Sequence, residues 1–124
     1  MTGNEIYFAA LGLLGESSSS AGDYDEEVVL QKINIMLPEV YPYNQNIRES
    51  QGLEKMKECP FLAALSEEVP FESNIVRMAL PYGLASKLAY DDDEAGKASY
   101  FNGMMATVLQ GMTPYVSDGV IDVY

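Results

Sequence analysis

Two consecutive stretches of helical periodicity, separated by the acidic run Asp91-Asp92-Asp93-Glu94, constrain the fold of this chain more than any other feature. In the first stretch, residues 73–90, apolar side chains recur at helical spacing on two roughly opposite sides. A helix that is apolar on two sides is either central in its own domain or shared with a neighbouring subunit. The second stretch runs to about Met112 with one apolar side, so the pattern predicts two adjacent helices.

The two apolar sides of residues 73–90 differ in composition. One side consists of Ile75, Met78, Ala79, Tyr82, Ala85 and Ala89. The other side combines three leucines with two basic residues, namely Leu80, Leu84, Leu88, Arg77 and Lys87. Proline has no backbone N–H and its ring disturbs the preceding helical turn, so Pro81 predicts a bend between Arg77 and Pro81.

The first part of the chain predicts two further helices joined by a polar linker. One helix is expected from about Asn4 to Leu14, with Gly15 as its C-terminal cap. Residues 16–22 are small and polar, which is typical of a linker. The next helix is expected to begin at an N-cap of Asp23 or Asp25.

Prolines limit this second helix in the sequence pattern. Pro38 is expected to kink or end it, and the run Tyr41-Pro42-Tyr43-Asn44 favours a turn or an exit. The middle of the chain, residues 42–72, is therefore predicted to be irregular, with room for one or two helical turns between residues 52 and 65. Residues 66–70 are expected to be extended, because a residue before proline avoids helical geometry.

The last residues, 113–124, change in character. Their order of apolar and turn-forming residues resembles a strand, a turn and a second strand, or an extended tail. A hairpin of this length is marginal alone in water and would need support from the rest of the domain or from another subunit. The predicted fold class is thus mainly α, a bundle of four to five helices over residues 1–112 with a β-hairpin or extended tail over residues 113–124.

The charge balance is strongly acidic, with 19 Asp and Glu against 7 Lys and Arg, a net charge of −12. Phosphate contacts need clustered basic side chains, and those of this chain are scattered, so sequence-specific nucleic-acid binding is not expected. The apolar runs are far shorter than the ~20 residues that a membrane helix needs, so no membrane association is expected. A single cysteine and the absence of a secretory signal pattern favour a cytoplasmic location.

Residue types that commonly form catalytic and metal sites are missing. The chain has no histidine, the commonest general base and a usual zinc ligand. Cys59 has no histidine to activate it, and a small buried side chain is the favoured interpretation. Residues 91–102 match a calcium loop in part only, because Ala95 fails as a ligand and Asn102 replaces a bidentate Glu. We therefore expect no enzymatic activity, no catalytic residue, no metal and no cofactor.

Aromatic residues indicate a role in protein–protein contact. The chain has nine tyrosines and no tryptophan, which is more tyrosine than a domain of this size is expected to bury with partners. Tyrosine is favoured at interfaces because it combines a large apolar area with a polar tip. We therefore expect some of the tyrosines to lie in an interface, whereas the methionines near the C-terminal helix are expected to fill the core.

Two segments of the chain resemble segments of one protein family. Leu80-Pro81-Tyr82-Gly83-Leu84-Ala85, followed by the acidic run and then by Tyr100-Phe101-Asn102, resembles the last two helices of the small head–tail connector (neck adaptor) proteins of tailed bacteriophages. The segment from Asn4 to Glu16, with its phrase Leu13-Leu14-Gly15-Glu16, resembles their opening helix. Together the two segments cover less than half of the chain.

The resemblance implies a phage or prophage structural protein without enzymatic activity, whose copies form a ring between portal and tail. The implied partners are other copies of the chain, the portal, and tail or neck proteins. The implied location is the virion neck, with the bacterial cytoplasm during assembly. The residues expected at the interfaces are Arg77, Leu80, Leu84, Lys87, Leu88, Tyr115 and Tyr124.

The acidic composition leaves a second hypothesis from a different class. An acidic phage-encoded binding module, such as an inhibitor or a DNA mimic, would act on a basic partner protein. Such a module would stay monomeric or dimeric, whereas a connector subunit would form a ring. A small enzyme is a third hypothesis, and no cluster of residues in the sequence supports it.

Overall fold

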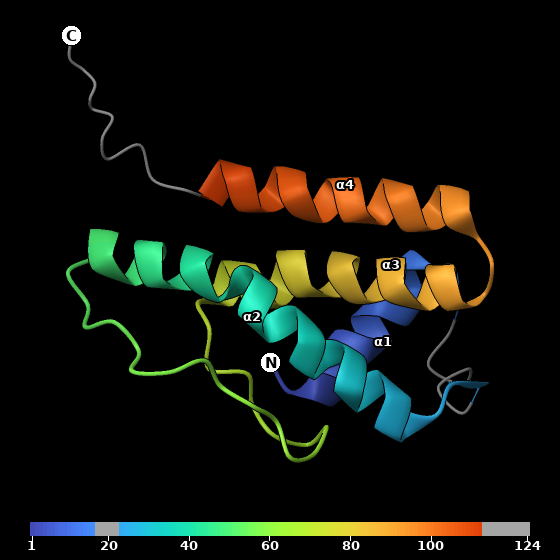
Figure 1. The fold of residues 1–124 in the computed structure, drawn as a ribbon, viewed down its shortest axis with the longest axis horizontal. Helices are drawn as coiled ribbons and strands as arrows, with labels where there is room; N and C mark the ends of the chain where they lie inside the picture. The colour runs from blue at the N-terminus through green and yellow to red at the C-terminus, as the bar shows by residue number, and fades with distance from the viewer. Residues whose placement is uncertain (17–22, 113–124) are drawn as a thin grey trace, which may run out of the picture.

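Four α-helices and one short π-helical segment make up the computed structural model, which describes residues 1–16 and 23–112 (Figure 1). In chain order they are α1 (Gly3–Leu13), α2 (Glu26–Ser50), η2 (Ile75–Ala79), α3 (Leu80–Asp91) and α4 (Ala95–Met112). The predicted fold class, a small and mainly helical bundle, is confirmed for these ranges. The predicted C-terminal hairpin and nearly all of the predicted linker lie outside them.

Helix α1 begins with a capping box. The Thr2 hydroxyl accepts a hydrogen bond from the Glu5 backbone N–H at 3.1 Å, and the Glu5 carboxylate accepts one from the Thr2 N–H at 2.8 Å. These two bonds satisfy donors that the first turn of a helix leaves unpaired. Gly15 follows the helix with a φ of 81°, the left-handed conformation that commonly ends a helix. The predicted limits of this helix are confirmed to within one residue.

Helix α2 is longer than the sequence pattern predicts, and the expected exit at residues 41–44 is wrong. It starts from an Asp25 N-cap, passes through Pro38 and Pro42, and ends at Ser50. Both proline side chains are exposed, whereas the opposite side of the helix remains buried as far as Asn44. Packing along this buried side therefore outweighs the missing backbone hydrogen bonds. Figure 1 shows α2 changing direction partway along its length, as expected for a helix that contains two prolines.

Residues 51–72, which follow α2, contain no helix, so the helical turns considered for residues 52–65 do not form. Amide side chains of α2 hold this segment in place. The Gln45 side chain donates to the Met56 carbonyl at 2.8 Å and accepts from the Met56 N–H at 2.9 Å. The fully buried Asn44 accepts a hydrogen bond from the Glu72 N–H at 2.8 Å. Further along, Glu68 forms an isolated antiparallel bridge with Thr2, in agreement with the extended geometry predicted there.

The disturbance predicted between Arg77 and Pro81 takes the form of the π-helical segment η2. The Leu80 N–H donates to the Ile75 carbonyl, five residues earlier, so the turn is wider than an α-helical turn. Pro81 then lies in the first turn of α3, where its missing N–H costs least. The wider turn thus lets the chain enter α3 without a break in the helical path.

Helix α3 is the centre of the bundle. It packs against α4, α1, η2 and α2, and Figure 1 shows α4 running alongside it. Gly83 makes this close packing possible: a Cβ atom at this position would lie 2.6 Å from the Met105 sulfur and 2.7 Å from the Met36 sulfur. The absence of a side chain at Gly83 therefore brings α2, α3 and α4 together.

The acidic run ends α3 and reverses the chain into α4, as predicted. Asp93 adopts a φ of 60°, and the Glu94 N–H donates to the Ala89 carbonyl at 2.9 Å. This arrangement satisfies carbonyl groups that the last turn of a helix leaves unpaired. Because α4 begins at Ala95, most of the stretch that matches a calcium loop in part is helical.

Candidate interaction surface

The three leucines predicted to lie at an interface are core residues of this chain. Leu80, Leu84 and Leu88 are at most 1% exposed, so their side chains cannot meet another subunit. The prediction is wrong for a physical reason that the sequence left open. Helix α3 has neighbours of the same chain on both sides, and these neighbours use both of its apolar faces.

The other predicted interface residues have different surroundings. Arg77 is exposed and forms no ion pair with the residues that the structure describes. Lys87 is partly exposed and forms an ion pair with Glu39 of α2 at 3.5 Å. Tyr115 and Tyr124 lie outside the described residues. Of the predicted set, Arg77 is thus the residue that the structure leaves available for a new partner.

The largest exposed apolar side chains point to another part of the surface. Phe61 is 76% exposed, Tyr90 is 72% exposed and Ile35 is 61% exposed. These are high values for residues whose transfer out of water is favourable. Tyr90 and Tyr100 are the exposed tyrosines among those described, and the expectation that some tyrosines lie in an interface stays a prediction.

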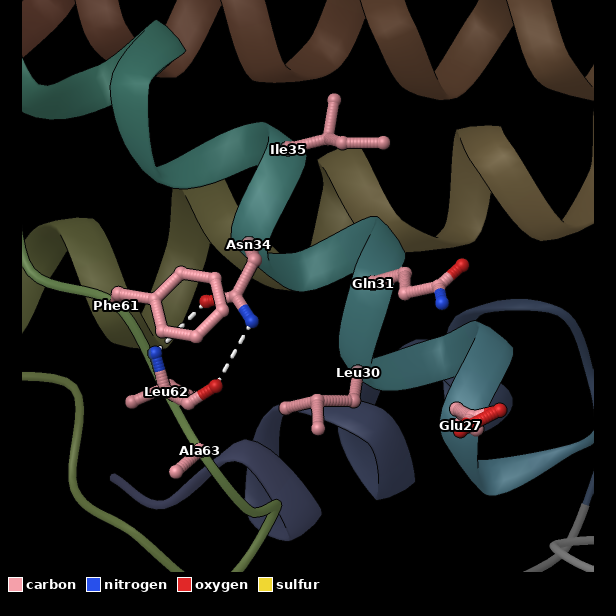
Figure 2. Close-up of a pocket in the computed structure, with 8 residues that line it drawn as sticks. All are labelled: Glu27, Leu30, Gln31, Asn34, Ile35, Phe61, Leu62 and Ala63. Carbon is pink, nitrogen blue, oxygen red and sulfur yellow. Dashed lines mark hydrogen bonds between the residues drawn. The ribbon is translucent and has the colours of Figure 1, made fainter.

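Phe61 and Ile35 belong to one groove, which we call the Phe61 groove (Figure 2). One wall is the first half of α2, and the other is the chain at residues 61–63. Its volume is about 550 Å³. The lining is mainly apolar and consists of Glu27, Leu30, Gln31, Asn34, Ile35, Phe61, Leu62 and Ala63.

Asn34 fixes the distance between the two walls of the Phe61 groove. Its side-chain amide donates to the Leu62 carbonyl at 2.9 Å and accepts from the Leu62 N–H at 2.8 Å, as Figure 2 shows. One side chain thereby replaces the pairing that a neighbouring β-strand would offer to this backbone. The wall that carries Phe61 is therefore held in a defined position although it has no regular secondary structure.

The groove becomes acidic toward the start of α2. A second hollow of about 300 Å³ shares Glu27 and Leu30 with the Phe61 groove and adds Glu26, Ala64 and Leu65. Within the described ranges, Glu26 and Glu27 form no ion pair. Both lie in the first turn of α2, where the helix dipole favours negative charge. A partner would therefore meet an apolar groove with two carboxylates at one end.

Ile35 also borders a hollow on the other side of α2, of about 340 Å³. Its lining includes the exposed Tyr90 and Lys32, whose ammonium group pairs with Asp91 at 2.7 Å. Ile35 thus borders both hollows, with Phe61 at one of them and Tyr90 at the other.

A separate hollow of about 210 Å³ lies between α1 and the start of α3, and we call it the Met78 patch. It is lined by Ala9, Leu13, Arg77, Met78, Pro81 and Tyr82. Met78 is 47% exposed, and the unpaired Arg77 stands beside it. The Met78 patch and the Phe61 groove share no residue.

Just before α2, the hydroxyl of Tyr24 lies between two carboxylates. The Tyr24 hydroxyl donates to the Asp92 carboxylate at 2.7 Å and lies 3.4 Å from the Glu16 carboxylate. Burial, the hydrogen bond to Asp92 and the negative charges nearby all raise the pKa of Tyr24. Tyr24 therefore joins the end of α1, the start of α2 and the α3–α4 turn as a neutral hydrogen-bond donor.

No cluster of three His, Cys, Asp or Glu side chains among the described residues is placed to hold a metal ion. Cys59 is partly buried, and burial raises the pKa of its thiol, so the reactive thiolate form is disfavoured. None of the helices in the described ranges is long and apolar enough to cross a membrane. No family model, no curated protein and no solved structure matches this chain.

The sequence pattern misses the Phe61 groove because one of its walls has no periodicity. A signal was nevertheless present. The buried stripe of α2 continues from Val40 to Asn44, and a polar residue in such a stripe needs a partner. The amides of Asn34, Asn44 and Gln45 indicate together that an irregular segment lies against this helix.

Proposed function

We propose that this chain is a structural subunit of a phage or prophage head–tail connector, which assembles into a ring through protein–protein contacts. The observation that carries the proposal is the Phe61 groove, an apolar surface bordered by the exposed side chains of Phe61 and Ile35. Exposed apolar and aromatic side chains gathered at one groove are a common feature of contact sites between proteins. The segments that resemble the last two helices of the connector proteins form the helices α3 and α4.

The acidic charge supports the same proposal. A connector ring surrounds the path of DNA, and a wall with a net negative charge does not bind the phosphate backbone. Five of the seven basic side chains form ion pairs with carboxylates among the described residues, which leaves few cations for phosphate. Such a wall would let DNA slide through the ring.

One observation favours the second candidate, an acidic module that binds a basic partner protein. Glu26 and Glu27 stand unpaired at one end of an apolar groove, which suits a partner segment with both apolar and basic side chains. In this case the groove would bind another protein and the chain would not form a ring.

The mass of the chain in solution separates the two candidates. Light scattering after size exclusion is measured at low and at high protein concentration, together with negative-stain electron microscopy. A connector subunit gives a ring-sized species, or a mass that rises from the 13.6 kDa of one chain with concentration. A chain that remains a monomer or a compact dimer, and that also does not bind a portal protein, contradicts the proposal.

A matched pair of variants shows whether the groove is responsible. Phe61→Asp places a charge in the groove and is expected to abolish assembly, because the contact would lose the exposed phenyl side chain. Leu53→Asp makes the same kind of change at an exposed apolar residue outside the groove and is expected to assemble normally. Equal assembly by both variants would exclude the Phe61 groove as the contact.

A further inference from the structure

We propose that the Phe61 groove of one copy of this chain binds the Met78 patch of a second copy, with Arg77 of the second copy facing Glu26 and Glu27 of the first. This inference rests on the proposed function, since it names the two faces by which subunits would join. It commits to a second copy of the chain as the occupant of the groove.

Charge complementarity is the first argument. Arg77 and Lys57 are the two basic side chains that have no ion pair among the described residues. Of these two, Arg77 stands beside exposed apolar surface, and Glu26 and Glu27 have the opposite charge at the end of another apolar surface. A guanidinium pairs well with carboxylates and loses less hydration than an ammonium group when it is buried.

Shape is the second argument. Phe61 is exposed by 76% at the edge of its groove, whereas the Met78 patch is hollow and lined mainly by apolar side chains. The Phe61 ring can therefore enter the Met78 patch while Met78 covers the apolar floor of the groove. Glu27 and Ile35 are eight residues apart on one helix, so the groove extends for about 12 Å along α2. A groove of this length can hold the Arg77 guanidinium and the Met78 side chain of the second copy next to each other.

The symmetry of such a contact has a consequence. The two faces share no residue, so each copy can offer its groove to one neighbour and its patch to another, which is a head-to-tail arrangement. A head-to-tail contact produces a ring if the rotation closes and a filament if it does not.

Charge reversal tests the contact. Arg77→Glu sets a carboxylate against Glu26 and Glu27, and the double change Glu26→Lys with Glu27→Lys sets cations against Arg77. Each variant alone is expected to lose self-association by roughly tenfold or more, since a close charge pair contributes at least about 1.5 kcal/mol. An equal mixture of the two variants is expected to associate again, because each variant then meets the opposite charge on both of its faces.

Two controls accompany the mixture. Lys57→Glu reverses the charge of the other unpaired cation, which lines neither face, and is expected to associate as the wild type does. Recovery in the mixture shows that both variants are folded, so no separate assumption about stability is needed. Association is measured by sedimentation velocity over a series of protein concentrations.

Cross-linking in a Cys59→Ser background tests the pairing of faces directly. Ala63→Cys marks the Phe61 groove and Ala9→Cys marks the Met78 patch. A short bis-maleimide is expected to join a chain with Cys in place of Ala63 to a chain with Cys in place of Ala9. Each of the two variants alone is expected to give no dimer. A dimer formed by either variant alone would indicate contact between two like faces and would overturn the proposal.

The outcomes separate this inference from the proposed function. If the wild-type chain forms a ring and each charge-reversed variant forms it equally well, the proposed contact is wrong and the connector function is unaffected. A wild-type chain that stays monomeric at every concentration overturns the contact, and one that in addition does not bind a portal protein overturns the connector function as well.

Discussion

Asn34→Ala is expected to loosen the wall of the Phe61 groove that carries Phe61. Asn34 makes both of its hydrogen bonds to the backbone of Leu62, at 2.8 and 2.9 Å. These are near-optimal lengths for such bonds. Alanine removes both bonds at once and leaves the N–H and the C=O of Leu62 without these partners.

The size of the effect follows from these two bonds. A hydrogen bond contributes about 0.5–1.5 kcal/mol net, so the pair contributes about 1–3 kcal/mol. Leu62 is only 2% exposed, which limits the access of water to its backbone groups and favours the upper half of this range. For a domain of this size, a loss of about 2–3 kcal/mol lowers Tm by about 8–12 °C.

Urea denaturation measures the change in the free energy of unfolding of the whole domain. Amide hydrogen exchange measures the loss of protection near Leu62. The Leu62 amide is expected to lose protection, whereas amides within α3 should retain theirs until the whole chain unfolds. Asn46→Ala is the matched control, since Asn46 is exposed on the same helix. A cost below about 0.5 kcal/mol for Asn34→Ala, equal to that of the control, would refute the view that this side chain holds the wall.

Three further expectations follow from the structure. Gly103→Ala should raise the free energy of unfolding by about 1 kcal/mol in urea titrations, because Gly103 lies inside α4 with no atom near its missing Cβ. Tyr24→Phe should lower stability at pH 7 by about 1 kcal/mol through loss of the bond to Asp92. Because the pKa of Tyr24 is raised in the folded chain, its contribution is fully present below about pH 10, where an unfolded tyrosine begins to ionise, and is lost as the pH rises further. Denaturation at several pH values should show a shallower decline above pH 10 in the phenylalanine variant. Self-association should strengthen between about 20 and 150 mM salt in sedimentation experiments, since salt screens the long-range repulsion between chains of net charge −12 more than it screens the Arg77 ion pair, which the contact shields from water.

Local signals predicted the limits of several helices correctly. Gly15 marks the end of α1, and the acidic run marks the reversal between α3 and α4. These signals depend on a few neighbouring residues, so a sequence pattern contains all that is needed. The π-helical segment η2 falls where Pro81 predicts a disturbance, for the same reason.

Features set by distant packing were not predictable in the same way. Proline in the pattern favours an end to α2, but the buried side of this helix, which continues to Asn44, keeps it helical. The leucines of α3 fit a core or an interface equally well until the positions of its neighbours are known. The Phe61 groove depends on the bond between Asn34 and Leu62, which are 28 residues apart in sequence.

The central position of α3 also affects the order in which the chain can fold. Helix α1 packs on α3, yet all of α2 and the irregular segment lie between them in the sequence. The α3–α4 pair closes a short loop and can form early, whereas the docking of α1 must close a long one. During synthesis, the apolar side chains of α1 therefore leave the ribosome first, and they stay exposed until α3 has been made and folded. A conservative core change such as Ile6→Val should accelerate unfolding more than it slows refolding, as stopped-flow kinetics can determine.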